Sequence, residues 1–150
     1  MGERLLLDVN ALAILLVEDH PGHEYVRDRL NPGLRGEDTL PVSDYLPLRA
    51  SGSSRRSGIS TACEPGAVTS VLNQPVELVA ASRETLRVAY EISAAEDHGV
   101  YDCFYVALAR QHDADALVTT DRDFETLCAE ESVAYENPVP DTVLAQFSEM

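Results

Sequence analysis

The stretch RLLLDVNALAILLV, residues 4–17, decides how the rest of the chain is to be interpreted. Residues 5–7 form an unbroken run of leucines, as in a strand that is buried on both faces of a parallel sheet. Asp8 follows directly, and the apolar segment 11–17 then indicates a helix. A carboxylate between a buried strand and a helix loses its hydration, so it requires hydrogen bonds, a countercharge or a metal ion. The rest of the chain is therefore expected to bring partners to Asp8.

The size and hydropathy of the chain favour one globular domain over residues 1–150. Of the 150 residues, 45% are hydrophobic, and a domain of this length buries about 68–70% of its unfolded surface. No apolar run approaches the roughly 18 residues of a membrane span, and no signal peptide is evident. We therefore expect a cytoplasmic protein with no membrane contact. Cys63, Cys103 and Cys128 are far apart and are expected to be small buried side chains rather than disulfides or metal ligands.

The charge composition is unusual. Asp and Glu number 26 against 11 basic residues, all of which are Arg. A net charge of −15 without any Lys is what we expect of a protein kept soluble in concentrated salt, so the composition indicates an extremely halophilic source. At about 1 M salt the Debye length is only about 3 Å, which screens the self-repulsion of such a surface. The alternative is an acidic protein with a basic partner, and neither case resembles the basic surface of a simple nucleic-acid binder.

The absence of Lys excludes several classes of enzyme. P-loop nucleotide hydrolases, protein kinases and Schiff-base enzymes each require a Lys. Receiver domains and haloacid-dehalogenase-type phosphotransferases also place an Asp after a first strand, but they normally use a Lys as well. His20 and His23 have a spacing that suits a metal, but no Cys or third His is nearby, so we assign them to a helix start.

Strands and helices alternate along the chain, which predicts a mainly parallel sheet in an α/β fold. We expect a three-layer α/β/α sandwich. Residues 31–36 are expected as a loop, 51–58 as a flexible polar loop, and 138–150 as a C-terminal tail that docks on the body or joins an interface. Ser82 is the expected N-cap of a helix, without a capping box because the Glu stands at position 84. The expected strands are 4–9, 39–42, 76–80, 116–120 and 133–135. The expected helices are 10–17, 23–30, 43–50, 82–95 and 100–109, and a last helix that follows the strand exit 121–124 and runs to about residue 130.

Three acids are expected to meet at one edge of this sheet. Asp8 and Asp121 each follow an apolar strand, and the carboxyl ends of parallel strands share one edge, where ligands bind at the topological switch point. Asp102 stands in the first turn of an apolar helix just before the second of these strands. Asp44 and Asp123 are placed to join them.

Such a cluster of carboxylates predicts a metal site. Like charges repel, and their pKa values rise unless a cation neutralises them. Oxygen ligands without Cys or His suit Mg²⁺ or Mn²⁺. Such an ion lowers the pKa of a bound water and stabilises charge at a phosphorus centre. The sequence therefore predicts a metal-dependent phosphodiesterase.

Three motifs in this order resemble the PIN-domain ribonucleases of the VapC toxin type. They are LLLDVNALAILL at 5–16, YDCFYVALAR at 101–110 and LVTTDRDF at 117–124. The likeness extends in order and spacing over most of residues 4–135. It implies a parallel α/β sandwich, Mg²⁺- or Mn²⁺-dependent cleavage of RNA, a homodimer and neutralisation by a cognate antitoxin.

The resemblance also implies roles for particular residues. Asp8, Asp102 and Asp121 would be the catalytic and metal-binding acids, and a second acid of the family corresponds most nearly to Asp44. Its offset differs from the usual spacing, and Glu37, Asp38 and Glu64 are weaker choices. The supporting residues would be Asn10, Thr120 and Asp123, with Asp123 as an alternate or extra acid.

The middle of the chain departs from the family pattern. Regular helix is expected where this chain has the polar segment 51–58, whose Arg55 and Arg56 are candidates for contact with RNA phosphate. An incomplete set of acids would favour a catalytically weak PIN module that acts by binding RNA or protein. A Toprim-like phosphotransferase using Asp121 and Asp123 is a further alternative, but Asp8 stands where that pattern has Glu.

Overall fold

The computed structural model describes residues 2–44, 73 and 75–149. The expected helix 43–50 beyond Asp44, the loop 51–58, and both Arg55 and Arg56 lie outside the described residues. The strands are β1 (Leu5–Leu7), β2 (Leu40–Ser43), β3 (Val76–Val79), β4 (Ala116–Val118) and β5 (Tyr135–Glu136). The helices are α1 (Val9–Leu16), α2 (His23–Leu34), α5 (Arg83–Glu96), α6 (Val100–Gln111), α7 (Asp123–Glu130) and α8 (Asp141–Leu144), and a 3-10 helix covers Ala145–Glu149.

All described strand pairs are parallel. One sheet has the order β1-β4-β5, and β2 pairs with β3. An isolated bridge between Arg4 and Thr39 joins the two sheets, and the Leu5 N–H donates to the Thr39 carbonyl at 2.9 Å. The combined order is therefore 3-2-1-4-5. The connections after β1 and β4 run in opposite directions, so the topological switch point lies between these two strands.

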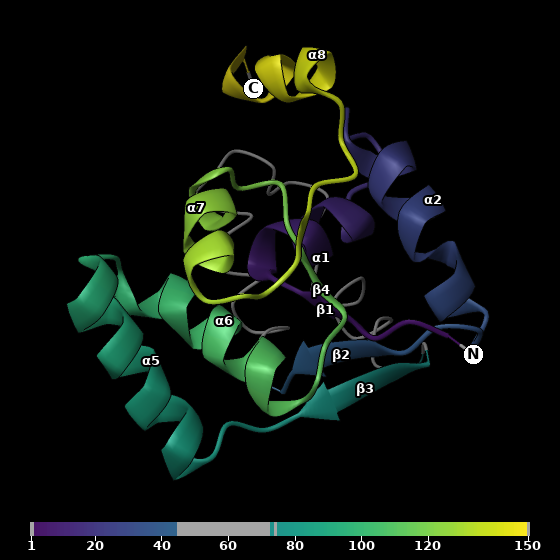
Figure 1. Ribbon diagram of the computed structural model, residues 1–150. Helices are drawn as coiled ribbons and strands as arrows, with labels where there is room; N and C mark the ends of the chain where they lie inside the picture. The colour runs from purple at the N-terminus through teal and green to yellow at the C-terminus, as the bar shows by residue number, and fades with distance from the viewer. Residues whose placement is uncertain (1, 45–72, 74, 150) are drawn as a thin grey trace.

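The centre of the sheet is fully buried from solvent. Leu5, Leu6 and Leu7 are each 0% exposed, as the unbroken leucine run predicted. Figure 1 shows α5 and α6 together on one flank of the strands and α2 on the opposite flank. The expected α/β class, with a parallel sheet between helices, is therefore confirmed. In the described part of the chain no helix is long and apolar enough to cross a membrane.

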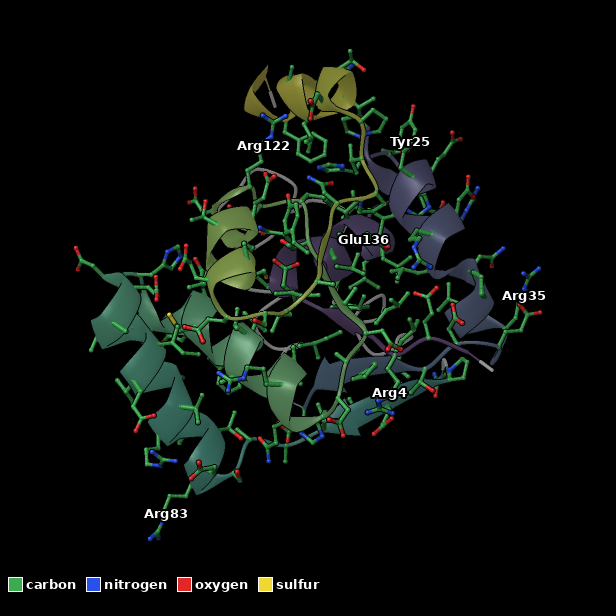
Figure 2. The ribbon with its side chains drawn as sticks, viewed as in Figure 1. Arg4, Tyr25, Arg35, Arg83, Arg122 and Glu136 are labelled. Carbon is green, nitrogen blue, oxygen red and sulfur yellow. The ribbon has the colours of Figure 1, made fainter. Side chains whose placement is uncertain are left out.

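Arginine–carboxylate pairs connect segments that are far apart in the sequence. Arg29 of α2 donates to Glu136 of β5 at 2.6 Å and to Glu3 at 2.9 Å. Arg4 donates to Glu77 of β3 at 3.0 Å. Figure 2 shows Glu136 near the centre of the view and Arg4 beside the β2–β3 pair. A planar guanidinium donates to two carboxylates at once, which an ammonium does less well.

The helix α2 is longer than expected. It continues through Pro32 to Leu34, so the prediction that a loop begins at residue 31 was wrong. Proline lacks the N–H that an interior helical position requires. Here the Pro32 carbonyl accepts the N–H groups of Glu37, at 2.8 Å, and Asp38, at 3.2 Å, which stabilises the end of the helix.

The start of α5 corrects a second expectation. The Ser82 hydroxyl accepts the Thr85 N–H at 3.2 Å, and the Thr85 hydroxyl accepts the Ser82 N–H at 3.0 Å. A capping box is therefore present, with the Thr hydroxyl in the position that Glu or Gln usually occupies. The expectation of no capping box was wrong because the Thr85 hydroxyl accepts the Ser82 N–H in place of a Glu side chain.

The C-terminal segment docks on the body of the protein, which settles one of the two alternatives for 138–150. Val139 is 4% exposed. The Phe147 ring packs edge-on against the His20 ring, with 4.5 Å between the ring centroids. Arg122 also pairs with Asp141 at 2.6 Å. Figure 1 shows α8 lying across one end of the molecule, near the start of α2.

We predict that Gly33→Ala destabilises the fold. An added Cβ would lie 2.4 Å from Cγ of Leu40, which is fully buried in β2. Because overpacking outweighs the better helix propensity of Ala, the free energy of unfolding should fall by about 1–3 kcal/mol. Urea unfolding of both proteins in the same salt measures the change. The control is Gly99→Ala, which meets no atom within 4 Å; a Gly33→Ala protein as stable as wild type would contradict the contact.

Candidate active site

Asp8 is buried where β1 ends and α1 begins. Its side chain is the N-cap of α1, and Oδ1 accepts the Ala11 N–H at 2.8 Å. The other oxygen, Oδ2, accepts the hydroxyl of Thr119 at 2.6 Å. Asp8 is only 1% exposed. The sequence argument required partners for this carboxylate, and these two donors are the partners that the fold provides.

Thr119 links Asp8 to Asp121. Its hydroxyl donates to Asp8 and also accepts the Asp121 N–H at 3.0 Å. The Asp121 carboxylate in turn accepts the Asp123 N–H at 2.9 Å. A continuous chain of hydrogen bonds therefore joins the ends of β1 and β4, at the topological switch point.

Sequence reasoning selected Thr120 as a supporting residue and missed Thr119. It extended the fourth strand to residue 120, but β4 ends at Val118. The register pairs Leu7 with Val118, so the next residues on the two strands, Asp8 and Thr119, lie side by side. The strand register was the signal that would have identified Thr119, while Thr120 is half-buried beyond it.

Asp102 lies in the first turn of α6, as expected. Its Oδ2 is 2.8 Å from Nε2 of His98, and the two side chains are 30% and 25% exposed. His98 lies in the connection between α5 and α6. It is thus a second polar neighbour of the acids that the sequence did not single out.

Burial and mutual repulsion raise the pKa values of two of these acids. The pKa of Asp8 rises from 3.8 to about 7, chiefly because burial removes water from the carboxylate. The donors Thr119 and Ala11 oppose this rise, while the charges of Asp121 and Asp102 add to it. Burial also raises the pKa of Asp121, with further contributions from the charges of Asp123 and Asp102. The three acids therefore lie within range of each other's charge.

The chemistry of this site fits a hard divalent cation. The donors are carboxylate oxygens, the ligands of Mg²⁺ and Mn²⁺, and a cation would relieve the repulsion that raises the two pKa values. Within residues 2–44 and 75–149, however, no three His, Cys, Asp or Glu side chains are gathered as a ready ligand set. The site therefore fits a divalent cation by the type of its donor atoms and by its electrostatics.

The other expected site residues lie at varied positions around this cluster. Asn10 is half-buried in the first turn of α1, and Asp123 is exposed at the start of α7. Asp44 is exposed just after β2, and its N–H donates to the Val79 carbonyl at 3.0 Å. The charges that raise the pKa of Asp8 are those of Asp121 and Asp102, so a catalytic role for Asp44 stays a prediction.

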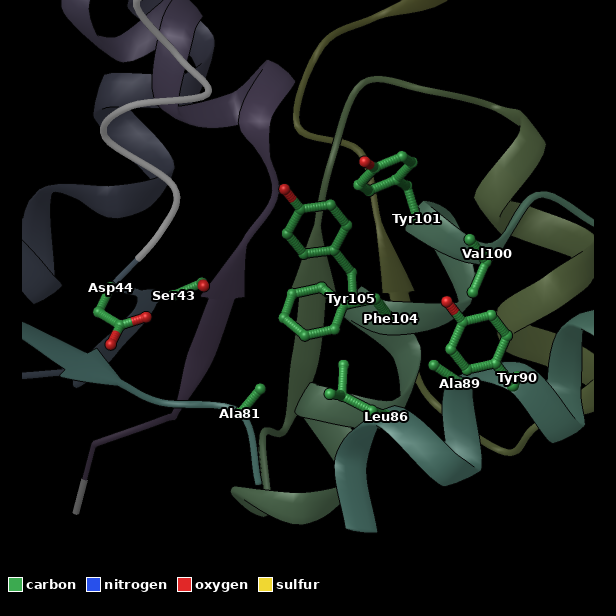
Figure 3. A pocket seen from close by; sticks show the side chains of 10 residues that line it. All are labelled: Ser43, Asp44, Ala81, Leu86, Ala89, Tyr90, Val100, Tyr101, Phe104 and Tyr105. Carbon is green, nitrogen blue, oxygen red and sulfur yellow. The ribbon is translucent and has the colours of Figure 1, made fainter. Parts of the chain in front are cut away.

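Asp44 instead borders an apolar cavity of about 360 Å³ between the ends of β2 and β3 and the helices α5 and α6. Figure 3 shows Ser43 and Asp44 on one side of it and Leu86 with several aromatic rings on the other. Tyr101, the residue before Asp102, is among them. The cavity therefore adjoins the acidic cluster, but Asp8, Asp102 and Asp121 do not line it.

The histidines at the start of α2 have structural partners. His20 Nδ1 accepts the Gly22 N–H at 3.0 Å, and His23 Nδ1 lies 3.1 Å from the Ile14 carbonyl. Burial lowers the pKa of His20, and the charge of His23 lowers it further. Their assignment to the start of a helix agrees with these contacts.

A family model for the PIN domain matches residues 5–130. The chain belongs to the PIN domain family. The comparison with curated proteins gave no match. The PIN assignment agrees with the parallel strand order of this α/β fold.

Several solved structures share this fold. One is VapBC2 from Rickettsia felis, bound to a DNA fragment from its promoter, with 16% identity and a TM-score of 0.65 over 89% of this chain and 98% of that chain. Another is VapC20 from Mycobacterium tuberculosis, a sarcin–ricin loop cleaving toxin, with 16% identity and a TM-score of 0.64 over 81% and 93%. A toxin–antitoxin complex from Klebsiella pneumoniae has 14% identity and a TM-score of 0.63 over 90% and 98%. At these identities the likeness shows the fold.

We predict that Asp8→Asn stabilises the metal-free protein at high pH. The pKa of Asp8 is 3.8 in the unfolded chain and about 7 in the folded protein. The stability that this carboxyl contributes is therefore complete below pH 4 and is lost as the pH rises from 4 through 7. The total loss is about 4 kcal/mol. The amide cannot ionise and still accepts the Ala11 N–H. The variant should therefore exceed wild type in free energy of unfolding by more at pH 8 than at pH 5.

Urea unfolding in EDTA measures this difference. Asp113→Asn is the matched control, because Asp113 is exposed and Asn tolerates its positive φ of 53°. A difference between Asp8→Asn and wild type that does not grow with pH would contradict the raised pKa.

Proposed function

We propose that this PIN protein is a metal-dependent endoribonuclease that cleaves RNA phosphodiester bonds. The single observation that carries the proposal is the buried Asp8 carboxylate, which is hydrogen-bonded to Thr119 and whose pKa is raised by burial and further by the charges of Asp121 and Asp102. A buried carboxylate with other acids nearby is costly to a fold, and a functional site is where such a cost is commonly found. Membership of the PIN family supports a nuclease.

Asp8, Asp102 and Asp121 would hold Mg²⁺ or Mn²⁺. When bound, the ion would supply a nucleophilic water of lowered pKa and stabilise charge at the phosphorus centre. The protein's own contribution is orientation: the Ala11 N–H and the Thr119 hydroxyl fix the Asp8 carboxylate, and the Asp123 N–H fixes that of Asp121. Asn10, Thr120 and Asp123 are proposed as supporting residues, and Asp44 as a further acid.

We further propose that the enzyme is the toxin of a toxin–antitoxin pair. Two of the structural neighbours are a VapBC assembly and a toxin–antitoxin complex, and a third is described as a toxin that cleaves the sarcin–ricin loop. A cognate antitoxin and a homodimer are the partners this implies. A basic antitoxin segment would complement the net charge of −15.

The second candidate is a catalytically weak PIN module that acts by binding RNA or protein. Two observations favour it: the described acids are not gathered into a ligand set, and Asp44 lines the neighbouring cavity. An RNA-cleavage assay distinguishes the two functions, because only a nuclease would cleave the RNA that it binds.

The test is cleavage of structured RNAs in concentrated KCl with Mn²⁺ or Mg²⁺, with and without EDTA. Asp8→Asn, Asp102→Asn and Asp121→Asn should each lower the rate by more than about 100-fold, since even outer-shell changes in metal sites cost about 10–100-fold. Asp113→Asn, an exposed acid with positive φ, is the matched control and should cleave as wild type does.

Two results would contradict the proposal of a metal-dependent nuclease. Cleavage that persists in EDTA, or in the Asp8→Asn protein, would show that the acids hold no essential ion. A folded wild type that binds RNA and leaves it intact would favour the binding module.

A further inference from the structure

The three-residue connection between α5 and α6 is held firmly. Asp97 ends α5 in the left-handed conformation, with a φ of 50°. The next residue, His98, donates its N–H to the Ser93 carbonyl at 3.3 Å, and its own carbonyl accepts the Ser93 hydroxyl at 2.5 Å. Because both backbone groups of His98 are bonded to Ser93, the direction in which its side chain leaves the chain is fixed.

That side chain reaches an acid of the candidate site. Nε2 of His98 lies 2.8 Å from Oδ2 of Asp102, one helical turn further along the chain. The ring is also close enough to Asp121 for its charge to act on that carboxylate. An imidazole whose backbone is held by Ser93 thus contacts Oδ2 of Asp102, and Oδ1 is not part of this contact.

A purely structural role is the alternative for this contact. His112, at the other end of α6, provides the comparison: it is the C-cap residue, and its Nε2 lies 3.3 Å from the Ala80 carbonyl. That contact joins α6 to the segment after β3 and involves no acid of the site. The His98 contact differs because its partner is a carboxylate that acts on both Asp8 and Asp121.

We propose that His98 is a positioning residue of the carboxylate site, which holds the Asp102 side chain in the orientation that binds the divalent cation. The proposal rests on the proposed function, because it assumes that Asp102 is a ligand. Its physical basis is that a carboxylate held by a second hydrogen bond loses less rotational freedom when it binds an ion.

The experiment measures Mn²⁺ binding to the full chain in concentrated KCl, by calorimetry and by electron paramagnetic resonance of free Mn²⁺, without RNA. His98→Ala should weaken binding by about 10–100-fold. His98→Gln keeps a side-chain N–H near the position of Nε2 and should recover most of the affinity. His112→Ala is the matched control and should bind Mn²⁺ as wild type does. Circular dichroism and thermal unfolding establish that each variant is folded.

The outcomes separate this inference from the proposed function. In one outcome, wild type binds Mn²⁺, Asp102→Asn abolishes binding, and His98→Ala binds as tightly as wild type. That outcome overturns the role of His98 and supports the metal site. An equal loss in His98→Ala and folded His98→Gln would also overturn positioning by a hydrogen bond. If folded wild type binds no Mn²⁺, both proposals fall.

Discussion

The hydrogen bond from the Thr119 hydroxyl to the Asp8 carboxylate, 2.6 Å long, is the interaction on which the candidate site depends. It lies where β1 and β4 end side by side, because the register pairs Leu7 with Val118. It gives a dehydrated carboxylate a second donor beside the Ala11 N–H. The same hydroxyl accepts the Asp121 N–H, so one side chain sets the relation between the two acids at the switch point.

The electrostatic consequence is a site in which negative charge predominates among the described residues. Burial raises the pKa of Asp8, and the charges of Asp121 and Asp102 raise it further. Burial also raises the pKa of Asp121, with additions from Asp123 and Asp102, and the whole chain carries a net charge of −15. Arginines such as Arg4 and Arg29 are engaged by carboxylates elsewhere on the sheet. A divalent cation is the group that would offset this repulsion, and His98 is the basic side chain in contact with Asp102.

Much of the fold could be predicted from the sequence because its signals are local. The leucine run at 5–7 predicted β1, and the apolar spacing of residues 100–109 predicted α6. The neighbours of the acids could not be predicted, since they depend on strand register and on one short connection. Thr119 lies beside Asp8 because the register pairs Leu7 with Val118, and the His98 ring reaches Asp102 from a backbone that Ser93 holds. The continuation of α2 through Pro32 likewise depends on donors from Glu37 and Asp38.

The most direct test of this account is the pKa of Asp8, measured by carboxyl ¹³C NMR on the metal-free protein and again with saturating Mg²⁺. The account predicts a value of about 7 without metal. It also predicts a fall of more than about one unit with Mg²⁺, because a nearby cation favours the ionised carboxylate. A metal-free value near the usual 3.9 for Asp, or a value that Mg²⁺ leaves unchanged, would contradict it.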